Sequence, residues 1–273
     1  MISHDLDFAH KLTVKEDWGN TKEEIAEILK FNPSGCFVCE VSGESIGMVM
    51  TTRYDRIAFL GNLIISESFR GEGRGEDLTK HALTYLENAG VETVMLDSVE
   101  RAVPLYERLG FRRACRSLRL RGSIESEPSE SLKTATRNDL SSISEIDRKH
   151  IGADRVRFLE SGLMSSNSIG RVMELQDRIA GYIFATKKTD FVWLGPWILS
   201  DELSRDEEML RDAAALHAID SQRVGVLETN SRALSCFQKC GLEITGFSWR
   251  MVRGSSQPVF SMAEYAIGSP ARG

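Results

Sequence analysis

The sequence predicts an α/β protein of mixed type, built as two tandem copies of one domain. Three observations support this fold class. Strand-like and helix-like stretches alternate along the chain, two long segments repeat without gaps, and a polar linker separates the halves. The linker, residues 122–131 (GSIESEPSES), is rich in serine and has no apolar periodicity. We therefore expect a first domain over residues 1–121 and a second over residues 132–273.

The repeat is visible in two blocks. Residues 45–61 align with residues 179–195 at a shift of 134 (195 − 61), and residues 96–111 align with residues 227–242 at a shift of 131 (242 − 111). The second half is therefore three residues shorter between the blocks (134 − 131), in the stretch that holds a glycine-rich loop in the first half. We infer that one copy has lost this loop.

The elements of the first copy follow from local patterns. Runs rich in β-branched and apolar residues predict strands at Cys36–Val41, Gly47–Thr52, Ile57–Ile65, Val91–Leu96 and Arg113–Leu120. Capping signals, helical spacing and terminal glycines predict three helices: Thr21–Leu29, a helix through Leu78, Ala82, Tyr85 and Leu86 that stops at Gly90, and Arg101–Leu109 before Gly110.

Composition narrows the class of protein. The 273 residues are 41% hydrophobic and 27% charged, as in soluble globular proteins. No apolar run is long enough to span a membrane and the N-terminus lacks the regions of a signal peptide, so we expect a cytoplasmic protein with reduced cysteines and no membrane partner. The net charge of −6 argues against a nucleic-acid partner, because such binding depends on basic phosphate contacts.

The segment FRGEGRGEDL (residues 69–78) predicts a turn from a strand into a helix that could bind phosphate through backbone N–H groups. A nucleotide triphosphate loop ends in Gly-Lys-Ser/Thr, whereas this loop ends in Gly75-Glu76-Asp77. A dinucleotide fingerprint needs a glycine at its sixth position, which is Glu76 here. Neither spacing matches.

A third pattern, Arg/Gln-x-x-Gly-x-Gly/Ala, matches Arg70–Gly75, and the downstream LYERLGF (residues 105–111) matches a second signature of the same family. On these motifs the chain resembles the GNAT superfamily of acetyl-CoA-dependent acyltransferases. The segments DWGN (17–20), Leu96-Asp97 and RMVRG (250–254) also resemble a tandem-GNAT subfamily with a divergent C-terminal domain. The resemblance implies two GNAT folds, each a splayed, mostly antiparallel mixed sheet flanked by helices.

The resemblance also implies a binding mode for acetyl-CoA as co-substrate. The pantetheine arm would lie along the backbone of Leu63, Ile64 and Ile65. The loop amides would cradle the pyrophosphate, a role that falls on Arg70, Gly71, Glu72, Gly73, Arg74, Gly75 and Glu76. The carboxylates of Glu76 and Asp77 would repel the pyrophosphate unless they are directed away from it.

Catalytic roles follow from the same resemblance. It implies that Tyr106 is the general acid beside the sulfur of acetyl-CoA; the alternative is a half-buried aromatic of an amphipathic helix. The general base stays open. Asp97, Glu100 and a base acting through water are candidates, and an N-cap role is the alternative for Asp97.

Trp18 and Asn20 are expected to contact the acceptor, which in this family enters between the first helices. Their alternatives are a packed aromatic and a helix N-cap. The acceptor class is a small-molecule or peptide amine, and the protein is expected to be a monomer or a homodimer.

The second copy is not expected to bind CoA. Phe237 replaces Tyr106, and the counterpart of the glycine loop, SDELSRDEEML (200–210), is acidic and contains no glycine. This copy would shape the acceptor pocket or replace a dimer partner.

No metal site is expected. The Cys36 and Cys39 thiols point to opposite faces of a strand, and Cys236 and Cys240 share a core-facing side of a helix. The leading hypothesis is an acetyl-CoA-dependent N-acyltransferase that acts by direct attack of an amine on the thioester. The alternative is a non-catalytic regulatory protein that binds CoA or a metabolite on a GNAT scaffold.

Overall fold

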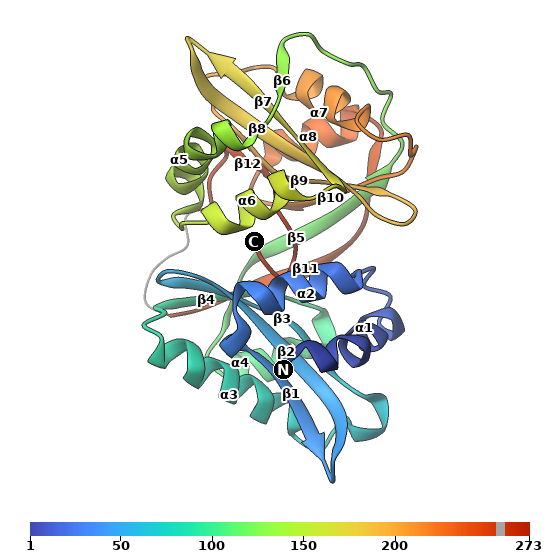
Figure 1. Cartoon of the computed structure of the whole chain (residues 1–273), viewed down its shortest axis with the longest axis vertical. Helices are drawn as coiled ribbons and strands as arrows, with labels where there is room; N and C mark the ends of the chain where they lie inside the picture. Colours follow the sequence, from blue (N-terminus) through green and yellow to red (C-terminus); the bar gives the residue numbers. More distant parts are fainter. Residues whose placement is uncertain (255–259) are drawn as a thin grey trace. The chain divides into compact units, whose positions relative to one another are not determined.

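The computed structural model describes residues 1–254 and 260–273, which form two compact units (Figure 1). The first unit contains residues 1–113, and the second begins at Ala114. Two long strands belong to both units: β5 (Arg112–Gly122) begins in the first and continues in the second, and β11 (Leu242–Gly254) begins in the second and ends in the first.

The division into units therefore differs from the boundary predicted at residue 121. Most of β5 belongs to the second unit, and the end of β11 from Met251 belongs to the first. The sequence repeat gives no sign of this exchange of strands. Of the predicted linker, Gly122 is the last residue of β5, and residues 123–131 lie outside helices and strands.

The first unit is a mixed sheet with helices on both faces (Figure 1). Its strands, in spatial order, are β1 (Cys36–Val41), β2 (Glu44–Tyr54), β3 (Ile57–Ile65) and β4 (Thr93–Ser98), followed by the end of β11. Its helices are α1 (Leu6–Lys15), α2 (Lys22–Phe31), α3 (Arg74–Asn88) and α4 (Val103–Arg108).

Successive side chains of a strand point to opposite faces of the sheet, so neighbouring residues of β1 pack against different helices. Cys36, Met48 and Ile64 join the core cluster under α1 and α2. Phe37, the neighbour of Cys36, turns to the opposite face and packs edge-on against His81 and Tyr85 of α3.

The second unit repeats this plan. Its strands follow the order β5-β10-β9-β8-β7-β6, with β12 on β9; they are β6 (Leu132–Thr134), β7 (Ser168–Leu175), β8 (Arg178–Lys187), β9 (Val192–Leu199), β10 (Gln222–Leu227) and β12 (Glu264–Ala266). Its helices are α5 (Leu140–Ile151), α6 (Val156–Met164), α7 (Asp206–Ala214) and α8 (Ser231–Lys239).

Several sequence signals act locally as predicted. At the start of α2 both arms of the capping box form, because Glu24 N–H donates to Thr21 Oγ1 at 3.2 Å and Thr21 N–H donates to Glu24 Oε2 at 3.0 Å. Gly90 follows α3 with φ +80°. The predicted bounds of β1 and β3 are confirmed, and the other predicted strands shift or lengthen by one to three residues.

Among the helices described in the first unit, α1 is not among the predictions. The spacing of Leu6, Ala9 and Leu12 is helical and was a usable signal for α1.

The predicted splay of the sheet is confirmed in both units. In the first, β3 and β4 pair in parallel only from Ile57–Thr93 to Phe59–Met95, although β3 continues to Ile65. Beyond Phe59, β3 keeps its antiparallel partner β2 on one side. The other edge of β3 has no strand partner among the described residues.

Candidate functional site

The glycine loop of the first unit presents a row of backbone donors. Gly71 and Gly73 have φ values of +83° and +81°, a region that side chains disfavour, and α3 begins directly after Gly73. Within the described residues, the N–H groups from Gly71 to Gly75 make no hydrogen bond. A Cβ added at Gly71 or Gly73 would meet no atom within 4 Å. The loop therefore has both the donors and the open space that an anion needs.

The two sequence motifs of the first unit meet at this loop. A Cβ added at Gly75 would lie 3.6 Å from Leu105 Cδ1 on α4 and 3.7 Å from Ile65 Cγ1 at the end of β3. In addition, Arg108 of α4 donates to the Glu76 carboxylate of α3 at 3.1 Å. The fold thus brings the loop, the strand edge and the helix of Tyr106 together.

The charged side chains of the loop are mostly paired within the protein. Arg70 donates from Nε to the carbonyl of Ile65 at 2.8 Å and forms an ion pair with Glu16. Arg74 pairs with Glu72 at 2.8 Å. The open donors of the loop are therefore backbone N–H groups rather than arginine side chains.

Glu76 does not face the loop as an isolated charge. Its carboxylate contacts Lys80 at 2.9 Å and Arg108 at 3.1 Å, and hydrogen bonds from Lys80 and Arg108 lower its pKa. The sequence alone raised the concern that this carboxylate repels a bound phosphate, and the two cations reduce that repulsion.

A bulge interrupts β3 at the start of the splayed segment. Met48 of β2 lies opposite Ile64 and Met50 opposite Gly61, so β3 carries one extra residue there. Asn62 adopts φ +53° in this bulge and is 6% exposed, and its Nδ2 has no hydrogen-bond partner among the described residues. The sequence analysis missed Asn62, although Gly-Asn inside a strand is a recognised signal for a bulge.

Tyr106 lies on α4 with its ring buried against Phe111, at 5.7 Å between centroids in an edge-on arrangement. Its hydroxyl forms no hydrogen bond within the described part of the chain. Burial raises the pKa of this hydroxyl well above its usual value, so the group stays protonated at neutral pH.

The two carboxylates considered as bases differ in position. Asp97 is half-buried inside β4, and the residue that caps the following 3-10 turn is Val99, so the N-cap alternative does not hold. Glu100 lies in that turn (Glu100–Ala102) with its side chain 62% exposed, and it pairs with Arg113 at 3.4 Å. Of the two, Asp97 is the more enclosed.

The loop between α1 and α2 carries Trp18 and Asn20. Trp18 is 40% exposed, so it is not a packed aromatic, and the N-cap of α2 is Thr21 rather than Asn20. Neither structural alternative for these two residues holds. Glu16, directly before this loop, accepts hydrogen bonds from Arg70 and from Arg101 (2.8 Å) and thereby connects it to the glycine loop.

Among the described residues of the second unit, the counterparts of these features differ. Phe237, the counterpart of Tyr106, is fully buried against Trp197 at 5.7 Å. The acidic residues in the first turn of α7 are paired: Glu207 with Lys239 at 3.4 Å and Glu208 with Arg205 at 2.6 Å. The bulge position equivalent to Asn62 is Pro196, which has no N–H group.

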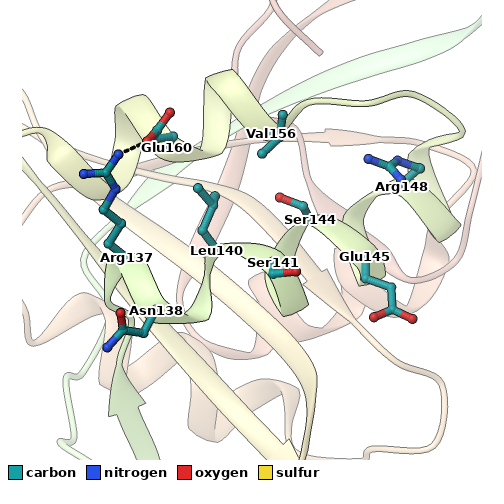
Figure 2. Close-up of a pocket in the computed structure, with 9 residues that line it drawn as sticks. All are labelled: Arg137, Asn138, Leu140, Ser141, Ser144, Glu145, Arg148, Val156 and Glu160. Carbon is teal, nitrogen blue, oxygen red and sulfur yellow. Dashed lines mark hydrogen bonds and ion pairs between the residues drawn. The ribbon is translucent and has the colours of Figure 1, made fainter.

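A surface pocket of about 680 Å³ lies between α5 and α6 of the second unit (Figure 2). Ion pairs flank it, Arg137 with Glu160 at 2.9 Å and Arg148 with Asp154 at 2.6 Å. Its lining residues are Arg137, Asn138, Leu140, Ser141, Ser144, Glu145, Arg148, Val156 and Glu160.

The first unit differs at the positions that correspond to this pocket. At a shift of 134 residues, Ser141 and Val156 correspond to Asp7 and Lys22, whose ion pair at 2.6 Å links α1 and α2 in the first unit. A hydroxyl and an isopropyl group replace that link in the second unit. Both arginines that line the pocket already have acidic partners.

The structure confirms the positions predicted for four of the cysteines. Cys236 and Cys240 are buried core residues, Cys36 is buried and Cys39 half-buried on opposite faces of β1, and all five thiols are free. Over residues 1–254 and 260–273, no cluster of His, Cys, Asp and Glu has the arrangement of a metal site.

Within the same residues, no helix has the length and apolar character required to cross a bilayer.

Comparison with protein families identifies both halves. Residues 6–111 match the profile described as "Acetyltransferase (GNAT) family", and residues 143–264 match the profile described as "Acetyltransferase (GNAT) domain". The chain is 34% identical over 64 residues to a glucosamine 6-phosphate N-acetyltransferase of Trypanosoma brucei brucei, a match to 23% of this chain and 44% of the relative. It is 32% identical over 94 residues to an uncharacterized N-acetyltransferase of Methanocaldococcus jannaschii, which covers 31% and 42% of the two chains. The chain thus spans less than half the length of either relative.

Solved structures share the fold of the chain. A Pyrococcus horikoshii protein described as an acetyltransferase superposes with a TM-score of 0.85 at 20% identity, over 100% of this chain and 94% of the other. A tandem GNAT protein from the clavulanic acid biosynthesis pathway gives a TM-score of 0.64 at 14% identity, over 94% and 98% of the two chains. At these identities the likeness shows the fold. The two profile matches establish that the chain belongs to the GNAT family of acetyltransferases and carries two GNAT domains in tandem.

Proposed function

We propose that the first unit transfers an acetyl group from acetyl-CoA to an amine, by direct attack of the amine on the thioester. The observation that carries this proposal is the row of N–H groups from Gly71 to Gly75 without hydrogen-bond partners among the described residues, at the N-terminus of α3. Five such donors and the positive end of a helix dipole suit a pyrophosphate. The free edge of β3 next to this loop suits the amide groups of a pantetheine arm.

The proposed acetyl-CoA site combines backbone groups of two elements. Along Leu63–Ile65 the splayed edge of β3 has backbone groups of alternate residues pointing away from β2, and the Ile65 carbonyl already accepts from Arg70 Nε at 2.8 Å. The loop segment from Arg70 to Glu76 surrounds the phosphates, with Gly71 and Gly73 leaving room for their approach. Acetyl-CoA supplies an activated acyl group, and the protein supplies orientation and proton transfer.

In the proposed reaction the acceptor nitrogen forms a bond to the thioester carbon and the carbon–sulfur bond breaks. The Tyr106 hydroxyl donates a proton to the departing sulfur, a role that suits a group held in its protonated form by burial. The proton leaving the acceptor nitrogen passes to Asp97 or to water.

Asn62 is a candidate donor for the charge that develops on the carbonyl oxygen. Its buried Nδ2 has no partner among the described residues and lies in the bulge where β3 leaves β4. Donors of this kind contribute most where water is excluded.

The acceptor is proposed to enter beside Trp18 and Asn20, in the loop between α1 and α2. The exposure of Trp18 supports this, because a large aromatic side chain on an exposed loop is a common recognition element. The acceptor belongs to the small-molecule or peptide amines, and the relatives do not narrow it further.

Calorimetry followed by a thiol-release assay tests this function. Acetyl-CoA should bind to the full chain, and an amine panel should identify an acceptor that releases free CoA thiol. A protein that binds acetyl-CoA but releases no thiol with any amine would support the regulatory alternative instead. No binding at millimolar acetyl-CoA would overturn both.

A further inference from the structure

The splayed cleft of the second unit contains a segment of the chain itself. β9 and β10 pair in parallel only from Val192–Gln222 to Leu194–Val224 and then diverge. Past that point β12 runs antiparallel to β9, and Leu199 N–H donates to the carbonyl of Ala263 at 2.9 Å. On the other side, Ile267 N–H donates to the carbonyl of Gly225 on β10 at 3.0 Å. One segment thus bridges both edges of the cleft.

We infer that the cleft between β9 and β10 is a strand-binding site, and that the C-terminal strand β12 of the same chain is its permanent occupant. Residues 263–267 are buried, with Tyr265 and Ile267 fully enclosed. Asn230 secures the segment, since its Nδ2 donates to the carbonyls of Met262 and Glu264 at 2.8 and 2.9 Å. Main-chain bonds provide affinity, as in other cases of strand addition.

Tyr265 connects β12 to the start of α7. Its ring packs on Trp197 at 4.6 Å between centroids, and its hydroxyl donates to Asp206 Oδ2 at 3.2 Å in the first helical turn. Arg232 lies 5.6 Å from the same ring and 3.5 Å from the Asp206 carboxylate. The Tyr265 ring and the Asp206 carboxylate, which is paired with Arg232, therefore fill this end of the cleft.

The two glycines that face the segment show how closely it approaches. A Cβ at Gly195 would lie 2.3 Å from the carbonyl oxygen of Ile267, and a Cβ at Gly225 would lie 2.8 Å from Ile267 Cγ1. A larger residue at Gly195 would clash with the strand backbone, and one at Gly225 would force the Ile267 side chain to move.

The repeat relates this occupant to the co-substrate of the first unit, a step that rests on the proposed function. At a shift of 134 residues, Trp197, Ile198 and Leu199 correspond to Leu63, Ile64 and Ile65. β12 therefore uses the backbone that the pantetheine arm would use in the first unit, and α7 corresponds in chain order to α3 after the glycine loop. The second cleft is closed to acetyl-CoA, which limits the chain to one equivalent.

Hydrogen exchange on the full chain tests the occupancy without any ligand. Gly225→Ala places a methyl group against Ile267. Gly246→Ala is the matched control on β11, where a Cβ would meet nothing within 4 Å. We expect the Leu199 and Ile267 amides to exchange slowly in the wild type, and about tenfold faster or more in Gly225→Ala than in the control. Equal rates in the two variants, or unprotected amides in the wild type, would overturn the inference.

Two further measurements keep the test decisive. If Gly225→Ala does not fold, Tyr265→Phe replaces it; this variant keeps the ring, loses the bond to Asp206 and should speed exchange of the same amides severalfold. Titration of the wild type with acetyl-CoA should give one equivalent per chain, and two equivalents would refute the occupied cleft. No binding would refute the proposed function of the first unit, and the exchange rates would then decide the strand inference alone.

Discussion

Tyr106→Phe separates catalysis from stability in the first unit. The substitution removes only a hydroxyl that makes no hydrogen bond among the described residues, and it keeps the ring that packs on Phe111. The free energy of unfolding should therefore change by less than about 0.5 kcal/mol. A general acid accelerates a reaction by about 10²–10⁴-fold, so loss of the proton should raise the barrier by about 3–5 kcal/mol.

Tyr85→Phe is the matched control in the same unit. Its hydroxyl donates to Asn32 Oδ1 at 2.7 Å, on the face of α3 that packs against β1. This variant should lose about 1–2 kcal/mol of stability, because it leaves a buried acceptor without its partner, and should keep the wild-type rate.

Three assays compare Tyr106→Phe and Tyr85→Phe with the wild type. Urea unfolding measures stability, calorimetry measures acetyl-CoA affinity, and thiol release measures the rate with the acceptor from the amine panel. Tyr106→Phe should bind acetyl-CoA as tightly as the wild type. A rate within a factor of three of the wild type would refute Tyr106 as the acid. Because burial raises the pKa of Tyr106, no loss of rate from its ionisation is expected below about pH 10.

Four further perturbations have defined outcomes. Gly73→Ala should weaken acetyl-CoA binding in calorimetry, because φ +81° costs a side chain about 1–2 kcal/mol and the loop amides shift to relieve it. Asn62→Gly keeps the positive φ of the bulge and removes the unpartnered amide, so it should lower the thiol-release rate more than acetyl-CoA affinity. Asp147→Asn breaks a fully buried pair with Arg155 at 2.6 Å and should cost about 3–5 kcal/mol in urea unfolding. Burial lowers the pKa of His150, so the folded state binds fewer protons than the unfolded state, and stability should fall as pH drops below about 6.5.

Each of these has a result that contradicts it. Unchanged acetyl-CoA affinity in Gly73→Ala would mean that the loop does not hold the phosphates, and a wild-type rate in Asn62→Gly would remove that donor. A loss below about 1 kcal/mol in Asp147→Asn would show that the buried pair is not needed for stability. For the pH dependence, His150→Gln is the control, and a wild-type profile as steep as that of this variant would exclude His150 as the source.

The local elements of this protein could be predicted from the sequence because their signals are local. The Thr21 capping box, Gly90 after α3 and the apolar run of β3 act through neighbouring backbone groups, so they do not depend on distant contacts. The repeat and the two motifs also sufficed for the family, since their residue spacing is a property of the chain.

Pairings between distant residues were decided only by the tertiary structure. Glu76 meets Arg108 across 32 positions, which turns an expected repulsion into an ion pair. Asn62 could not be identified as an unpartnered donor until the bulge and its burial were known.

By itself the sequence determined that the chain holds two related GNAT domains, which half carries the glycine loop, and where Tyr106 stands relative to it. The tertiary structure decided where each unit ends and what fills the cleft of the second. The physical reason is that strand pairing joins backbone groups of any sequence. The N–H and C=O groups that β12 shares with β9 and β10 leave little trace in residue type beyond the glycines that make room for it.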